Sequence, residues 1–149
     1  MTRSDRLLVI RPADTGELDA LLVLYNASRV AAGCFNGGDV TRAEFLGSIE
    51  GEDVHVAMLG EDIVGFASVW VPERFIHHLY VSPAHQRAGV GSALLRACEA
   101  RYGRPMSLKC VTRNLRARCF YAQHGWRSEA GGVGDDGPWE HWHSPTPRR

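Results

Sequence analysis

Residues 77–95 read HHLYVSPAHQRAGVGSALL, and they join an apolar strand pattern to a helical one through a glycine-spaced turn. A helix that begins near Gly89 and Gly91 leaves its first amides unpaired, and its dipole favours an anion at that end. Glycines there also let phosphate oxygens approach the backbone. The stretch therefore predicts a phosphate-binding turn, and the alternative is a plain strand-to-helix connection that binds nothing.

Two common phosphate-binding motifs do not fit this turn. A P-loop requires Gly-Lys-Ser/Thr after four intervening residues, and the chain has no lysine at that place. A Rossmann fingerprint requires a third glycine, where this chain has Leu94, and an acidic residue about 20 positions later, where it has Val111. The sequence thus argues against nucleoside triphosphate hydrolysis and against dinucleotide binding.

Length, charge and cysteine content limit the remaining classes. The chain has 149 residues and is 44% hydrophobic, which fits a single domain over residues 1–149. Seventeen basic residues balance seventeen acidic ones, so we expect neither nucleic acid nor a membrane as a partner. No apolar run reaches the length of about 18 residues that a membrane span needs, and we expect a cytoplasmic protein. Its four cysteines are expected to be reduced and structural: Cys34, Cys98, Cys110 and Cys119.

Hydrophobic periodicity and turn residues predict the element order β, α, α, β, β, β, α, β, α, β, β. We expect strands at 6–12, 54–59, 63–71, 75–81, 106–111, 126–130 and 139–143, and helices at 18–31, 41–50, 90–102 and 115–124. The glycine-rich segment 131–138 is expected to be a flexible loop. This order predicts a mixed sheet with helices packed on it.

The hexapeptide at 86–91, QRAGVG, resembles the Q/R-x-x-G-x-G/A signature of the GCN5-related N-acetyltransferases, or GNAT superfamily. LYVSP at 79–83 is similar to the end of the family's fourth strand, and NLRARCFYAQHGW at 114–126 is similar to its second motif. Residues 10–28 resemble its opening strand and helix. The resemblance implies an α/β (mixed α+β) GNAT fold, in which a mostly antiparallel, twisted sheet of six to seven strands has helices on both faces and is splayed between strands 4 and 5.

The same resemblance implies an acetyl-coenzyme A site and no metal. The amides of the turn would hold the coenzyme's pyrophosphate, and the exposed backbone of the fourth strand would pair with the pantetheine arm and polarise the thioester carbonyl. Asn114 would also contact the pantetheine arm, although a role in helix capping alone is the alternative. The coenzyme-contacting residues expected on this basis are Leu79, Tyr80, Val81, Gln86, Arg87, Ala88, Gly89, Val90, Gly91, Ser92, Asn114 and Phe120.

The resemblance also suggests the residues that move protons. Tyr121 would lie beside the sulfur and protonate the departing thiolate; the alternative is an aromatic residue that only packs on the helix face. The amine must lose a proton before it attacks. His77 is the first candidate for that base because strand alternation puts it on the face of Leu79. His78 is the second candidate, Glu73 acting through water is a third, and in the remaining alternative no residue acts as base.

The sequence does not identify the acceptor amine. The family usually builds the acceptor site from loops that correspond here to 28–38 and 131–143. Their acidic residues could pair with a cationic amine and their aromatic residues could stack on it, or they could simply be solvated: these are Asp135, Asp136, Glu140, Phe35, Trp139 and Trp142. Three arginines could meet the coenzyme's ribose phosphate or be solvated: Arg113, Arg116 and Arg118.

These observations predict an N-acetyltransferase that transfers acetyl directly from acetyl-coenzyme A to a primary amine of a small molecule, peptide or protein. A homodimer is compatible with this prediction. One alternative is a non-catalytic domain that senses acetyl-coenzyme A. Another is transfer of a different acyl group, for which the shape around Phe66, Trp70 and Leu79 would matter.

Overall fold

The computed structural model describes residues 7–145, and its elements follow the predicted order. The strands are β1 (Leu8–Pro12), β2 (Asp53–Leu59), β3 (Asp62–Trp70), β4 (Phe75–Val81), β5 (Ser107–Val111), β6 (Arg127–Gly134) and β7 (Gly137–His143). The helices are α1 (Leu18–Ala32), α2 (Arg42–Ile49), α3 (Val90–Tyr102) and α4 (Leu115–Gln123). Short 3-10 turns span Thr15–Glu17, Val71–Glu73 and Pro83–His85. The first residue of the predicted strand 6–12 lies outside the described residues.

All seven strands form one sheet in the order β1-β2-β3-β4-β5-β7-β6. Every neighbouring pair is antiparallel except β4 and β5, which are parallel. This parallel pair is joined only at Phe75 with Ser107 and at Ile76 with Leu108, whereas β4 pairs with β3 as far as Val81. The two strands therefore diverge beyond Ile76, which confirms the expected splay of the sheet.

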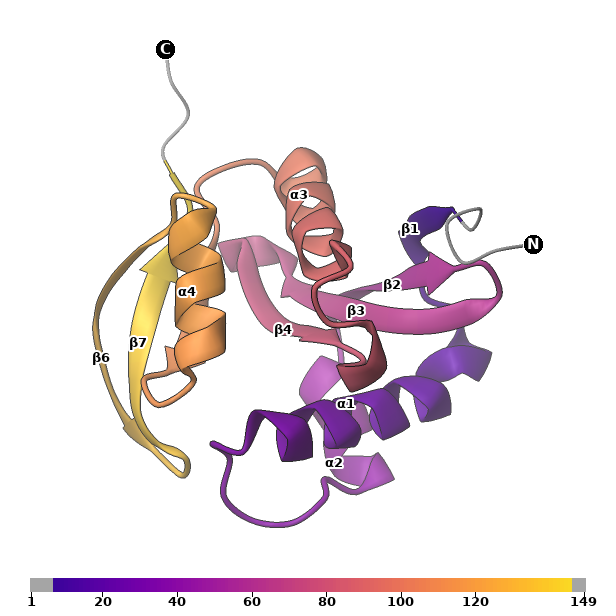
Figure 1. Ribbon diagram of the computed structural model, residues 1–149, viewed down its shortest axis with the longest axis horizontal. Helices are drawn as coiled ribbons and strands as arrows, with labels where there is room; N and C mark the ends of the chain where they lie inside the picture. The colour runs from indigo at the N-terminus through magenta and orange to yellow at the C-terminus, as the bar shows by residue number, and fades with distance from the viewer. Residues whose placement is uncertain (1–6, 146–149) are drawn as a thin grey trace.

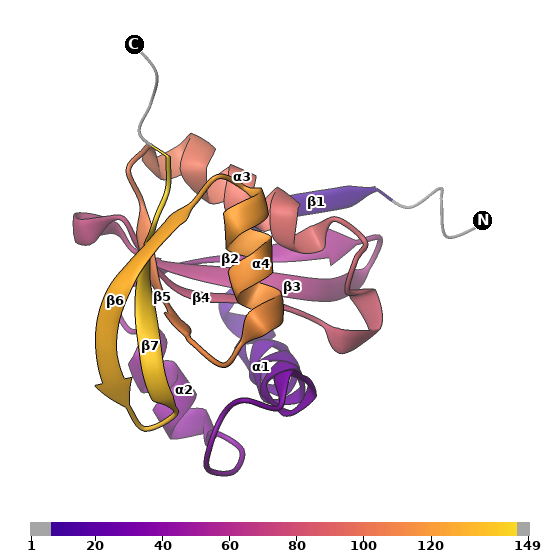
Figure 2. The ribbon, with the colours of Figure 1, turned by 60° about the vertical axis from the view of Figure 1, so that its left-hand side comes forward.

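Helices cover both faces of this sheet. Helices α1 and α2 lie together on one side, α3 crosses the other side, and α4 lies in front of the last strands (Figures 1 and 2). The α1 and α2 side has a core that includes Leu21, Phe45 and Phe66, and the α3 and α4 side has a core that includes Leu94 and Trp126. Among the described residues, no helix is long and apolar enough to cross a membrane.

Local capping explains where several helices begin and end. Thr41 Oγ1 accepts a hydrogen bond from the amide of Glu44, whose carboxylate accepts one from the Thr41 amide, so α2 begins with a capping box. Helix α1 ends at Gly33, which has a φ of +70° and donates its amide to the Arg29 carbonyl. These short-range signals are the reason that the helix positions could be predicted.

The predicted flexible loop at 131–138 is wrong. Strand β6 continues to Gly134 and β7 starts at Gly137, so only two residues separate them. The indole of Trp139 lies against the β6 backbone, and a Cβ on Gly131 would stand only 2.2 Å from that ring. Glycine is therefore required here by the close approach of an aromatic side chain, because no other residue leaves room for it.

All four cysteines are free, as predicted. Three of them are buried, and burial raises the pKa of the Cys98 and Cys110 thiols to about 12, which fits inert packing residues. Cys119 is instead exposed on α4, so its predicted structural role is not supported by core packing.

Strand β4 contains a β-bulge at its two histidines. Ser68 pairs with His78 but the next β3 residue, Val69, pairs with Ile76, which leaves His77 as an extra residue. A bulge interrupts the alternation of side chains along a strand. The imidazoles of His77 and His78 accordingly stack, with ring centroids 4.1 Å apart. The alternation argument that put His77 on the face of Leu79 is therefore wrong, because it assumed a regular strand.

Candidate active site

The glycine turn at the start of α3 presents free amides. The first amide with an intrahelical acceptor is that of Ala93, which donates to the Gly89 carbonyl, so the three amides that precede it have no acceptor within the helix. Gly89 has a φ of +80° and Arg87 a φ of +66°. Left-handed residues in such a turn curl the backbone so that successive amides point to one concave side. The turn therefore has the geometry of an anion-binding site.

The two glycines of the turn serve different needs. A Cβ on Gly89 would meet no protein atom within 4 Å, so this residue is required for its left-handed backbone. A Cβ on Gly91 would lie 3.3 Å from the Phe120 ring and 3.6 Å from Val81. Gly91 therefore allows α4 to pack closely against the start of α3, at the end of β4.

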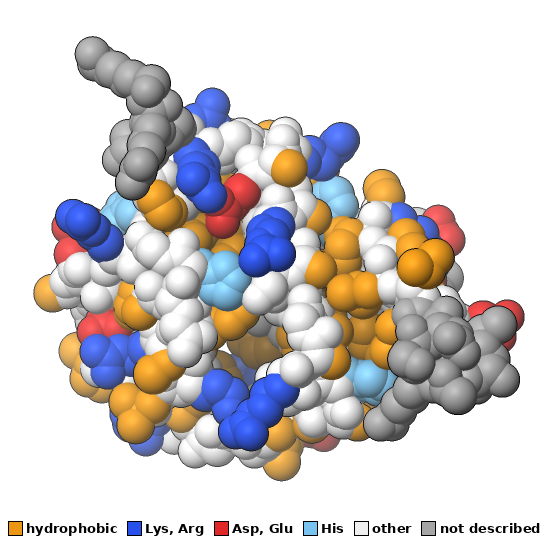
Figure 3. Space-filling view, turned by 45° about the horizontal axis from the view of Figure 1, so that its top comes forward, with side chains coloured by type: hydrophobic (Ala, Val, Ile, Leu, Met, Phe, Trp, Pro, Cys, Tyr) orange, Lys and Arg blue, Asp and Glu red, His pale blue; other side chains and the backbone are white. Residues whose placement is uncertain are grey.

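A cleft of about 100 Å³ lies where β4 and β5 diverge. Figure 3 shows a hollow with hydrophobic side chains in its depth and basic side chains at one edge. The cleft is lined by residues of β4, β5, α4 and the segment after α1: Phe35, Ile76, His77, Leu79, Tyr80, Leu108, Lys109, Cys110, Val111, Asn114, Ala117 and Tyr121. The structure thus brings together six residues that were predicted for the site, namely Phe35, His77, Leu79, Tyr80, Asn114 and Tyr121.

His77 is held by a residue that the sequence analysis did not find. Its Nδ1 donates to Oε2 of Glu52, at 2.9 Å. The carboxylate belongs to the connection between α2 and β2, and its side chain is only 7% exposed. Such a partner fixes the orientation of the imidazole and leaves Nε2 as the nitrogen that can accept a proton.

His78 has a different environment, inside the protein. It is 4% exposed, its Nδ1 lies 2.6 Å from Ser68 Oγ, and its ring contacts those of Tyr25, Phe45 and Phe66. Burial, followed by the neighbouring His77, lowers the pKa of His78 to about 3. A group that resists protonation this strongly is a poor proton acceptor at neutral pH.

The burial of His78 predicts an acid-sensitive fold. An imidazole binds a proton near pH 6.5 in the unfolded chain but only near pH 3 when folded. The contribution of His78 to the free energy of unfolding is therefore fully present above about pH 6.5. As the pH falls from there toward 3, this contribution decreases by at most about 1.4 kcal/mol per pH unit. Urea unfolding at a series of pH values measures the slope, and His78→Gln should reduce it. Equal slopes in both proteins would contradict the assignment.

Tyr121 belongs to α4 and lines the cleft. The residue is 7% exposed, and its ring contacts those of Phe120, Trp126 and Trp142. Burial raises the pKa of its hydroxyl far above the ordinary value. The hydroxyl is therefore protonated at neutral pH, as a proton donor must be.

Asn114 was predicted either to contact the pantetheine arm or only to cap a helix, and the structure shows the helix cap. Its Oδ1 accepts a hydrogen bond from the Ala117 amide at 3.2 Å, so it caps α4. The residue also lines the cleft. Coenzyme contact stays a prediction.

Several residues predicted for the acceptor, or for the ribose phosphate of the coenzyme, are engaged with other protein groups. Asp136 Oδ1 accepts from the Asn36 amide at 2.7 Å, which ties the β6–β7 turn to the segment after α1. Glu140 pairs with Arg118 at 2.8 Å. Arg113 donates to the carbonyls of Cys34 and Asp136.

The aromatic candidates also differ from one another. Phe35 lines the cleft and lies under the guanidinium of Arg29, 4.7 Å from its ring centre. Trp142 is buried in the core, and Trp139 covers β6. Among these aromatics, Phe35 is therefore the one that lines the cleft.

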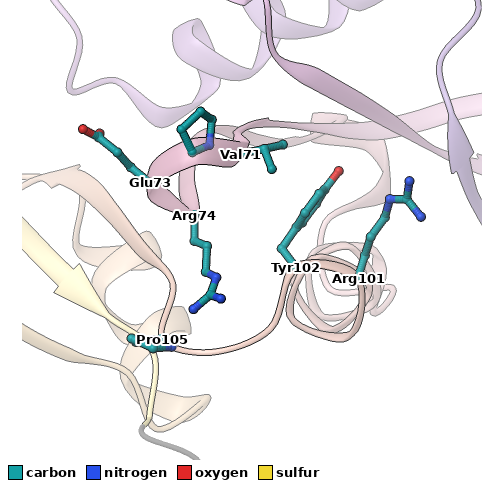
Figure 4. Close-up of a pocket in the computed structure, with 7 residues that line it drawn as sticks. Val71, Glu73, Arg74, Arg101, Tyr102 and Pro105 are labelled. Carbon is teal, nitrogen blue, oxygen red and sulfur yellow. The ribbon is translucent and has the colours of Figure 1, made fainter.

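A larger hollow, of about 600 Å³, lies beyond the end of β3. It contains Glu73, the third candidate base, together with Arg74, Arg101 and Tyr102. The side chains of Glu73 and Arg101 point outward on opposite sides rather than toward a common point (Figure 4). Glu73 is not among the residues that line the splayed cleft.

The splayed sheet, with a glycine turn at the end of β4, is the fold class of the coenzyme A-dependent acetyltransferases. A model of the acetyltransferase (GNAT) domain matches residues 50–128, which is more than half of the chain. The chain belongs to the GNAT acetyltransferase family. A search of curated proteins finds no match.

Solved structures share the fold at low sequence identity. A GNAT-family acetyltransferase from Bacillus cereus ATCC 10987 has a TM-score of 0.74 and 18% identity, over 95% of this chain and 99% of that one. Apo YjaB from Escherichia coli has a TM-score of 0.73 and 20% identity, over 92% and 95%. YncA from Salmonella typhimurium, solved with its cofactor acetyl-CoA, has a TM-score of 0.68 and 22% identity, over 91% of each chain.

Proposed function

We propose that this protein transfers the acetyl group of acetyl-coenzyme A directly to a primary amine of a small molecule, peptide or protein. The observation that carries the proposal is the splayed cleft, because one opening in the sheet is lined by both a buried phenol and an oriented imidazole. The turn with its free amides follows β4, the strand that forms one wall of this cleft. We take residues 1–149 as one acetyltransferase domain. Its unpaired cysteines fit a reducing compartment, for which we propose the cytoplasm.

The coenzyme is bound in this proposal by backbone groups. The amides from Arg87 to Ser92 hold the pyrophosphate, with Gln86 donating to the Val81 carbonyl at 3.0 Å and so fixing the turn to β4. Beyond the splay, the β4 backbone at Leu79 to Val81 has no β5 partner and pairs with the pantetheine arm. An amide from this strand polarises the thioester carbonyl.

Two side chains move protons. His77 Nε2 accepts a proton from the ammonium, oriented by Glu52, and the neutral amine attacks the carbonyl carbon. The carbon–nitrogen bond forms, the nitrogen then loses its second proton to solvent, and the carbon–sulfur bond breaks while Tyr121 donates its proton to the sulfur. Solvent then returns a proton to Tyr121 and takes one from His77, so neither residue is consumed. His78 supports the imidazole of His77 from behind by stacking.

Tyr121→Phe separates chemistry from packing. If the hydroxyl protonates the thiolate, turnover should fall by about 10 to 10³-fold while coenzyme affinity barely changes, because the lost interaction belongs to the transition state. Some activity should remain, because a thiolate is stable enough to depart without first being protonated. The matched variant Tyr121→Ala also creates a cavity and should cost about 3 to 5 kcal/mol of stability. A Phe variant with wild-type turnover would exclude the acid role.

A thiol-release assay with acetyl-coenzyme A tests the function itself. The acceptor panel comprises polyamines, aminoglycosides, amino acids and peptide N-termini. Release that depends on one class of amine supports the proposal. Tight coenzyme binding without release for any amine would favour the sensor alternative, and faster release from a longer acyl-coenzyme A would favour another acyl group. Of the residues considered for acyl choice, Leu79 lines the cleft, whereas Phe66 is in the core and Trp70 is exposed.

A further inference from the structure

Three potential metal ligands meet on the outer surface of the β6–β7 hairpin. His141 and His143 lie two residues apart on β7, and Glu129 is directly opposite His141 on β6. Trp142, between the histidines, is buried in the core, so both imidazoles are on the opposite, solvent side of the strand. Their ring centroids are 4.3 Å apart. The hairpin therefore gathers two imidazoles and one carboxylate on one exposed face.

The distances fit a transition-metal ion. Glu129 Oε1 lies 2.8 Å from His143 Nε2 and 4.0 Å from His141 Nδ1, and the three ligand atoms all lie within 4.8 Å of one another. Bonds of about 2.0–2.1 Å in a tetrahedral site separate ligand atoms by about 3.3 Å, which falls between the two shorter distances. Small side-chain rotations would bring the three atoms to equal spacing. Water can fill the open coordination positions because the side chains are 35–66% exposed.

We propose that Glu129, His141 and His143 bind a divalent transition-metal ion of the zinc type. Two imidazoles and one carboxylate prefer zinc and its neighbours to magnesium or calcium, which favour oxygen ligands. The ion joins the edge strand β6 to β7, in a place separate from the cleft.

Two cations border this cluster and lower its affinity for a metal. Lys109 is opposite His141 on β5 and Arg127 is opposite His143 on β6. The Lys109 ammonium lies over the Trp139 ring, 4.4 Å from its centre. The flanking charges favour a site of moderate affinity rather than a permanent structural metal.

Titration calorimetry of the full chain without a histidine tag tests the proposal, with zinc as the probe and magnesium as the negative control. We expect one zinc ion per chain at neutral pH, and a thermal midpoint higher by about 5 to 10 °C when zinc is near 100 times its dissociation constant. His143→Ala and the conservative Glu129→Gln should each weaken zinc binding by at least about 10- to 100-fold.

A second cluster in the same chain supplies the matched control. Glu52, His77 and His78 also lie within 4.8 Å of one another, so His77→Ala should leave zinc affinity unchanged if the ion binds at the hairpin. Loss of binding in His77→Ala but not in His143→Ala would overturn the proposal. So would the absence of any zinc-dependent heat, or unchanged affinity in both hairpin variants.

Discussion

Gly91→Val should weaken acetyl-coenzyme A binding by about 100-fold or more. The new Cβ would stand 3.3 Å from the Phe120 ring, and its two methyl groups would cover the amides that face the phosphates. A hydrogen bond to a charged group contributes about 1.5–3 kcal/mol, so losing one or two of them is enough for a change of this size. Titration calorimetry with acetyl-coenzyme A measures the effect directly.

Two further variants separate ligand binding from damage to the fold. Gly91→Ala should bind within a few-fold of wild type, because the GNAT signature that this turn resembles accepts alanine at that place. Gly47→Val makes the same substitution within α2, where a Cβ meets no atom within 4 Å, and should leave coenzyme affinity unchanged. A folded Gly91→Val protein with wild-type affinity for acetyl-coenzyme A would contradict the prediction that this turn binds the pyrophosphate.

His77→Ala should lower turnover by about 100-fold or more if this imidazole is the base. The variant should also lose the ionisation that limits the rate at acid pH, because a protonated imidazole cannot accept a proton from the ammonium. Coenzyme affinity should change little. A pH–rate profile of kcat/KM on wild type and variant provides the measurement.

Glu52→Gln is the companion variant, because it keeps the shape of the partner and removes its charge. If Glu52 orients His77, turnover should fall by about 10-fold or more while coenzyme affinity changes little. Glu61→Gln, an exposed carboxylate in the β2–β3 turn, is the control. A rate profile of unchanged shape and height in His77→Ala would mean that the amine loses its proton elsewhere.

The parts of the fold that could be predicted depend on short-range signals. The helix caps at Thr41 and Asn114, the glycine turn and the hairpin at residues 60–62 are each determined within a few residues of chain. Local sequence and local structure agree at these places, so the element order followed correctly. The site residues of β4 and α4 could be named because they belong to continuous motifs.

Other features arise from contacts between distant segments. Glu52 meets His77 across 25 positions of sequence, and no local pattern joins them. The glycines at 131 and 132 indicated a loop, but they are needed because Trp139 packs on them. The metal-ligand cluster combines a His-x-His pair with a carboxylate from the neighbouring strand, and strand pairing alone brings them together.

The extra residue in β4 has a consequence for protein engineering. Because the bulge separates position 77 from the regular register of the strand, its side chain can be exchanged without changing the pairing of Leu79 and Val81 with β3. The side chain at position 52 comes from the connection between α2 and β2, but it is only 7% exposed, so its replacement must fit the space beside position 77. A combinatorial library restricted to these two codons would sample proton-transfer partners, and with them the working pH, on an unaltered scaffold.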